Sequence, residues 1–179
     1  QKLVKPMVAG TDTPRGDFAA VGYVAVGMDK NQPPLLKSPY VLSDQVKLVG
    51  AQLADGVLGD KGDVPRVQAA SSMTLTLAWQ DVRPADADYV TLVHLIAPDG
   101  TAAKQFDRAP LQGVVPTSLW REGDTLLDTY TIDIPADLPA GDYQLLVGLY
   151  DLPTLTRLPV QLDQAPAGDT IHVATVTVP

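Results

Sequence analysis

Cysteine is absent from this 179-residue chain, and histidine and aromatic residues are scarce. Without cysteine there are no disulfides, no thiolate metal sites and no cysteine nucleophile. The only histidines, His94 and His172, lie in strand-like segments, where we expect a hydrogen-bonded structural role. The HExxH and G-x-S-x-G motifs are also missing. These absences argue against thiol, serine-elbow and zinc-dependent hydrolases.

Basic residues are too few and too scattered for nucleic acid. The chain has 13 Lys and Arg against 21 Asp and Glu, which gives a net charge of −8. Binding to phosphate backbones draws on clustered cations, so we expect no nucleic-acid partner and no attraction to an anionic membrane surface.

Long hydrophobic runs are lacking as well. The apolar segment "FAAVGYVAVGM" (18–28) is too short for a bilayer, which needs about 20 residues. No cleavable signal pattern precedes it. Because the chain begins with Gln1 instead of Met, we expect a processed or excised piece whose anchor or signal was removed.

Alternating apolar and polar residues indicate strands. In 71–80, Met73, Leu75, Leu77 and Trp79 share one face, which predicts a half-buried strand with Trp79 in the core. Sixteen prolines and 14 glycines fall between such segments and mark turns. Further strands are predicted within 45–53, 88–100, 125–135, 136–151 and 170–179, with 54–70 as a turn-rich connection.

This spacing predicts an all-β fold, a two-sheet antiparallel β-sandwich of immunoglobulin-like or jelly-roll-like type. The corner "PAGDY" (139–143) is similar to the tyrosine-bearing turn of immunoglobulin-like sandwiches, in which the hydroxyl bonds to upstream backbone. We expect residues 1–44 to form an N-terminal arm or linker with one docked strand, and 45–179 to form the sandwich.

The stretch "QFDRAPLQGVVPTSLW" (105–120) fits neither a strand nor a helix period. It is either the crossover from one sheet to the other or a binding site. Trp120 beside Asp107 and Arg108 has the aromatic and polar mixture that sugar sites use, but an indole also plugs the end of a sandwich. The candidate ligand-binding residues, centred on the 105–124 loop, are Trp120, Asp107, Arg108, His94, Tyr130 and Asp128.

Acidic residues within and after the loop suggest two other chemistries. A glycosidase needs two carboxylates about 5–10 Å apart, and Asp107, Glu122, Asp124, Asp128 and Asp151 are the candidates. Calcium needs several oxygen ligands, and "DKGD" (60–63) is the nearest match, although a polar turn is the simpler interpretation. We therefore expect no catalytic residue, no metal and no cofactor.

Several segments together carry a family resemblance: "LTLAWQ", "DYVTLVHLIAPDG", "QFDRAPLQGVVPTSLWREGDTLLDTYTIDIPADLPAGDYQLLVGLYD" and "RLPV". They resemble the C-terminal β-sandwich domain of bacterial, Chloroflexi-type, family 39-like membrane glycosyltransferases. The resemblance covers about residues 45–179, and the N-terminal "TDTPRGDFAAVGYVAVG" departs from it. It implies an extracytoplasmic module beside an enzyme that handles polyprenyl-linked sugars, and it transfers no catalytic residue.

The resulting expectation is a non-catalytic extracytoplasmic module, an accessory or interaction domain of a membrane glycosyltransferase-type protein. Its expected partner is a glycan or the membrane-embedded part of its own protein. The alternative is a carbohydrate-binding module that uses the 105–124 loop, and a paired-carboxylate hydrolase is the third hypothesis.

Overall fold

The computed structural model describes residues 33–54, 57–58 and 65–179, and nearly all regular structure in them is β-strand. The longer strands are β1 (Leu35–Leu42), β2 (Val46–Ala54), β5 (Ser72–Asp81), β6 (Tyr89–Ile96), β8 (Thr125–Asp133), β9 (Gly141–Asp151) and β13 (Ile171–Val178). The shorter ones are β3 (Val57–Leu58), β4 (Arg66–Val67), β7 (Ala102–Gln105), β10 (Thr156–Arg157), β11 (Val160–Leu162) and β12 (Ala165–Pro166). Two 3-10 turns, η1 (Pro110–Gly113) and η2 (Thr117–Leu119), lie between β7 and β8.

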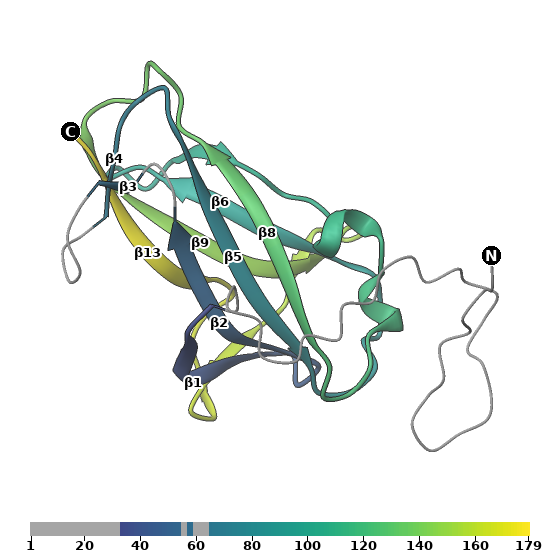
Figure 1. Ribbon diagram of the computed structural model, residues 1–179. Coiled ribbons are helices and arrows are strands. Elements are labelled where there is room, and N and C mark those ends of the chain that lie inside the picture. Colours follow the sequence, from purple (N-terminus) through teal and green to yellow (C-terminus); the bar gives the residue numbers. More distant parts are fainter. Residues whose placement is uncertain (1–32, 55–56, 59–64) are drawn as a thin grey trace.

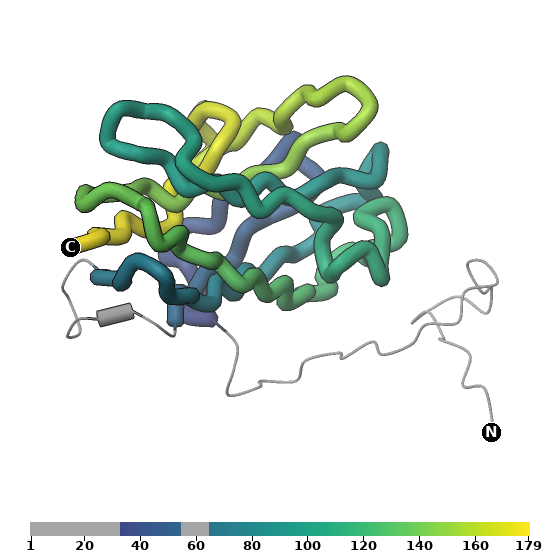
Figure 2. Tube along the Cα trace, turned by 90° about the horizontal axis from the view of Figure 1, so that it is seen from above, coloured from purple at the N-terminus to yellow at the C-terminus, as the bar shows by residue number. Residues whose placement is uncertain are grey.

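These strands form two sheets that pack face to face. One sheet has the order β12-β11-β1-β2-β5-β8, and the other has the order β3-β4-β13-β9-β6-β7, with β10 added to β9. In Figure 1, β2, β5 and β8 lie in front of β13, β9 and β6, and Figure 2 shows the same two layers from above. The pairings are antiparallel except for one parallel contact between β13 and β4.

The strand order confirms the predicted β-sandwich class. The run β2-β5-β8 facing β13-β9-β6-β7 corresponds to strands A-B-E facing G-F-C of an immunoglobulin-like sandwich, with one more strand beside C. The link from β7 to β8 therefore has to cross from one sheet to the other.

Side chains at every second position fill the space between the sheets. On β5 the predicted inward face is confirmed, because Met73, Leu75, Leu77 and Trp79 are all buried. The predicted tyrosine corner is also confirmed: the hydroxyl of Tyr143 donates to the carbonyl oxygen of Pro139 at 2.8 Å. This bond holds the turn that leads from β8 into β9.

The described part of the expected N-terminal arm contains one strand. Residues 35–42, which have no clear alternation, form β1, and this strand pairs with both β2 and β11. The apolar run 18–28 lies outside the described residues, so the division at residue 44 stays a prediction. In the described part of the chain, no helix is long and apolar enough to cross a membrane.

Candidate functional site at the sheet crossover

The first residues of the 105–124 loop continue the line of β7 along β6, in the sheet that contains β13, β9, β6 and β7. The amide of Phe106 donates to the carbonyl oxygen of Val93 at 2.8 Å. Arg108 and Thr91 then exchange two backbone hydrogen bonds, of 2.9 and 3.2 Å, as in a short antiparallel ladder. The loop therefore begins as an ordered edge of the sheet.

Asp107 projects from this edge toward the outer face of the seven-stranded sheet. One carboxylate oxygen accepts the backbone N–H of Val93 at 3.0 Å, and the other lies 3.2 Å from Nε2 of His94. His94 is only 7% exposed, so it is a buried, hydrogen-bonded histidine. Tyr150 lies near enough that burial and the charge of Asp107 raise the pKa of its hydroxyl.

Arg108 links the two sheets through its guanidinium group. Its Nη2 donates to Asp128 Oδ1 and to the carbonyl oxygen of Thr129, both at 2.8 Å. Its guanidinium carbon lies 3.7 Å from the centre of the Tyr130 ring. The Tyr130 hydroxyl in turn donates to Asp128 Oδ2 at 2.8 Å. Burial and the neighbouring Asp128 carboxylate raise the pKa of that hydroxyl above its ordinary value. The Tyr130 hydroxyl is therefore the proton donor in its hydrogen bond with Asp128.

The middle of the loop is a left-handed turn. Leu111, Gln112 and Gly113 have φ values of 52°, 57° and 76°. Only glycine adopts this region without a steric cost, so the conformation at the first two residues is strained. Leu111 is partly buried against the core, and this packing holds the turn in place.

The end of the loop closes the sandwich. Trp120 is 1% exposed, and its Nε1 donates to the carbonyl oxygen of Val115 at 3.1 Å. The hydroxyl of Thr117 donates to the carbonyl oxygen of Ala87 and accepts the amide of Tyr89, both at 2.8 Å. A buried indole offers no face to a sugar ring, so this geometry favours the plug over the stacking platform.

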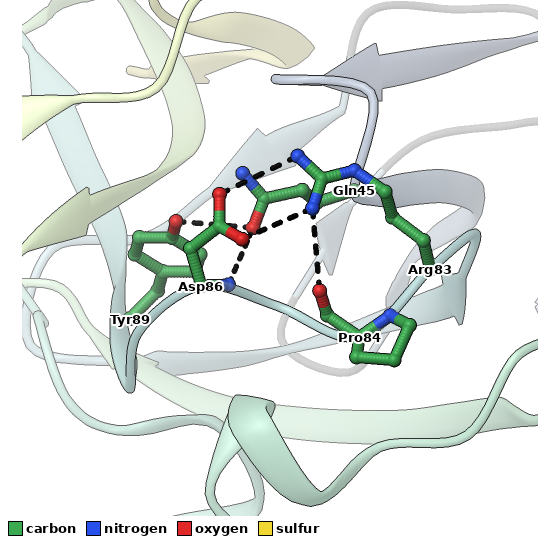
Figure 3. A network of polar contacts seen from close by, with 5 residues as sticks. All are labelled: Gln45, Arg83, Pro84, Asp86 and Tyr89. Atoms are coloured by element: carbon green, nitrogen blue, oxygen red, sulfur yellow. Dashed lines mark hydrogen bonds and ion pairs between the residues drawn. The ribbon is translucent and has the colours of Figure 1, made fainter.

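A second polar network, drawn in Figure 3, joins the β1–β2 turn to the β5–β6 connection. The side-chain oxygen of Gln45 accepts the Asp86 amide at 2.8 Å and the Tyr89 hydroxyl at 3.1 Å. Arg83 and Asp86 form an exposed ion pair of 3.0 Å beside it. The side chains of this network, Gln45, Arg83, Asp86 and Tyr89, bind one another or nearby backbone. The network therefore stabilises this end of the sandwich.

Asp81, the last residue of β5, is a buried carboxylate that the sequence analysis did not single out. It is 2% exposed, and neither carboxylate oxygen has a hydrogen-bond partner among the described residues. Burial, followed by the charges of Glu122 and Asp124, raises its pKa to about 6. Its alternation with Leu77 and Trp79 was the available signal, because continuing that face by two residues places Asp81 inside.

The structure therefore distributes the six candidate residues over three places. Asp107 and His94 lie on the outer face of one sheet, Arg108 with Asp128 and Tyr130 lies between the sheets, and Trp120 lies in the core. In the parts that the structure describes, no three His, Asp or Glu side chains are grouped to hold a metal ion. The "DKGD" segment (60–63) lies outside those parts.

Comparison with known proteins supports the fold alone. No family model matches the chain, and no curated protein matches it. Among solved structures, the C-terminal domain of Wzt is similar, with a TM-score of 0.50 and 13% identity over 83% of this chain and 82% of that domain. A Niemann-Pick type C2 protein from the Japanese carpenter ant has a TM-score of 0.46 and 9% identity over 76% of this chain and 95% of that one.

A third similar structure is the CARDB domain of a Pyrococcus furiosus protein, in complex with di-metal ions. Its TM-score is 0.35, with 12% identity over 86% of this chain and 100% of that domain. At these identities the likeness shows no shared activity. The β-sandwich part of the expected resemblance is confirmed, and the link to a membrane glycosyltransferase stays a prediction.

Proposed function

We propose that this chain is a non-catalytic β-sandwich module that works outside the cytoplasm, as an accessory or interaction domain of a membrane glycosyltransferase-type protein. One observation carries the non-catalytic part. The polar side chains at the crossover bind one another: Asp107 holds His94, and Arg108 holds Asp128 and Tyr130. Arg108, Asp128 and Tyr130 join the two sheets, and the Asp128 carboxylate is 1% exposed, so this cluster is placed to stabilise the sandwich and not to meet a substrate.

The cellular context rests on the sequence resemblance over residues 45–179. The acidic surface and the β-sandwich fold are compatible with it, and the expected partner is the membrane-embedded part of the same protein. A screen of chromogenic glycosides tests the absence of catalysis. We expect no turnover, and hydrolysis of any glycoside that is lost when one of the five candidate carboxylates is replaced by its amide would overturn this part of the proposal.

The lack of cysteine allows a direct test of location. Thr131→Cys places one thiol at an exposed position of β8, and Leu77→Cys places one in the core as the matched control. Whole cells that produce the natural protein carrying either substitution are treated with a membrane-impermeant maleimide, and the protein without either substitution gives the background labelling. We expect labelling at position 131 in intact cells and at position 77 only after denaturation. Labelling at 131 that requires permeabilised cells contradicts an extracytoplasmic location.

Carbohydrate binding through residues 105–124 is the alternative. Because Trp120 is buried, the loop residue left for it on the outer face is Asp107, which lies beside His94 and close to the partly exposed Tyr150 of β9. Calorimetric titration with a glycan panel compares the wild type, Asp107→Ala and Tyr150→Ala, with Thr131→Ala as a distant surface control. Absence of heat in all four proteins removes the alternative, and heat lost only in the first two variants replaces our proposal with it.

A further inference from the structure

The junction between β5 and the turn that follows Trp120 depends on few contacts. The amide of Gly123 donates to the carbonyl oxygen of Asp81 at 3.0 Å. The other two hydrogen bonds, from the Asp81 amide to Asp124 and from the Gln80 side chain to Gly123, are both 3.4 Å long. This junction fixes the point at which the crossover enters β8, so loosening it releases the end of the crossover.

The Asp81 side chain lies at this junction without a counter-charge or donor of its own. Both carboxylate oxygens are shielded from solvent and have no partner among the described residues. On the β2 side its register neighbour is the uncharged Val46. A buried carboxylate in this position is costly when ionised and much less so when protonated, because burial disfavours the charged form.

The charges that act on Asp81 are mostly of its own sign. Glu122 and Asp124, in the turn on the β8 side, both oppose its ionisation. Arg83, on its own segment, favours it but is bound to Asp86 at the surface. Ionised Asp81 thus adds a third carboxylate charge to those of Glu122 and Asp124, in a turn that also carries Arg121.

We propose that Asp81 is a pH-sensitive latch: its neutral form leaves the backbone bonds between β5 and the turn at Gly123 undisturbed, and its ionised form, repelled by Glu122 and Asp124, weakens that junction. The latch adds a conformational control at the crossover that is independent of the function proposed above.

The sign of the effect follows from proton linkage. Burial raises the pKa of Asp81 from 3.8 to about 6 in the folded protein. The folded state therefore binds this proton more tightly than the unfolded state does. Its contribution to stability is fully present below pH 3.8, decreases as pH rises, and is lost above about pH 6. Carboxylates in favourable ion pairs stabilise the folded state more as pH rises, so their pH dependence is distinguishable from that of Asp81.

Carbon-detected NMR on the wild-type chain tests the latch without any substitution. We expect the Asp81 carboxyl resonance to titrate with a midpoint near pH 6 and the Gly123 amide resonance to follow it. In Glu122→Gln the midpoint decreases, because one like charge is removed. An Asp81 midpoint near its ordinary 3.8, or a Gly123 amide that does not respond, overturns the proposal.

Thermal unfolding provides a second readout. Asp81→Asn removes the titrating group, and Asp137→Asn is the matched control because Asp137 is exposed. Between pH 4.5 and 7.5 the melting temperature of Asp81→Asn minus that of the wild type is expected to rise by about 5 °C. The corresponding difference for Asp137→Asn stays constant. A constant difference for Asp81→Asn contradicts the latch.

Discussion

Replacing Arg108 with methionine tests the crossover most severely. The substitution keeps an apolar stem of similar length and removes the hydrogen bonds to Asp128 and Thr129 and the contact with the Tyr130 ring. The Asp128 side chain, 1% exposed, then keeps only the Tyr130 hydroxyl as a donor. Leaving a buried charge without its partner costs about 3–5 kcal/mol, and because Arg108 is partly exposed we expect about 3 kcal/mol.

Urea denaturation measures this loss directly. A domain of this kind has a free energy of unfolding of about 5–15 kcal/mol, so the variant stays folded and its midpoint falls while its m-value does not change. The control is Arg157→Met, whose ion pair with Asp169 is 3.6 Å long with side chains 41% and 54% exposed. Such a pair contributes about 0–1 kcal/mol.

A second substitution decides whether the uncompensated charge is the cause. In Arg108→Met/Asp128→Asn the buried side chain is neutral and still accepts the Tyr130 hydroxyl. We expect the double variant to regain at least half of the lost stability. A loss below about 1 kcal/mol in Arg108→Met, or no recovery in the double variant, refutes the clamp between the sheets.

Three further substitutions test the packing around the crossover by the same denaturation assay. Tyr143→Phe removes the tyrosine-corner hydrogen bond and is expected to cost about 1 kcal/mol. Thr117→Val leaves the Tyr89 amide and the Ala87 carbonyl without their partner, and a loss of about 2 kcal/mol is expected. Trp120→Ala opens a cavity in the core and is expected to cost about 3–5 kcal/mol, whereas an unchanged midpoint means that the indole is not buried.

Alternation was a reliable guide where a strand has one buried and one exposed face. β8 meets this condition and β5 approaches it with a largely half-buried outer face, and both were predicted from their apolar positions. One docked strand was expected within residues 1–44, but its position at β1 was not predicted, because Pro39 lies in the irregular part of β1, where the register with β2 shifts between Leu35 and Tyr40. Short strands such as β11 are defined by their pairing with neighbours, which local sequence does not encode.

The candidate site at the crossover shows a second limit of prediction from the sequence. Arg108 and Asp128 are 20 residues apart, and their contact depends on which residue of β8 lies opposite the end of the loop. That register is set by nine consecutive pairs between β5 and β8, which is a tertiary property. The lack of a strand or helix period in residues 105–120 marked the loop as unusual. That signal could not show that the polar residues of the loop bind their neighbours in the fold.

Hydrogen–deuterium exchange of the wild-type chain across residues 106–124 tests the central claim, that this segment is a hydrogen-bonded crossover. The account predicts slow exchange at the amides of Phe106, Arg108 and Trp120, whose N–H groups all donate to backbone carbonyls. The reference is the set of β8 amides that bond to β5, because β8 lies at the end of its sheet. Exchange at these three amides as fast as in an exposed loop would contradict it.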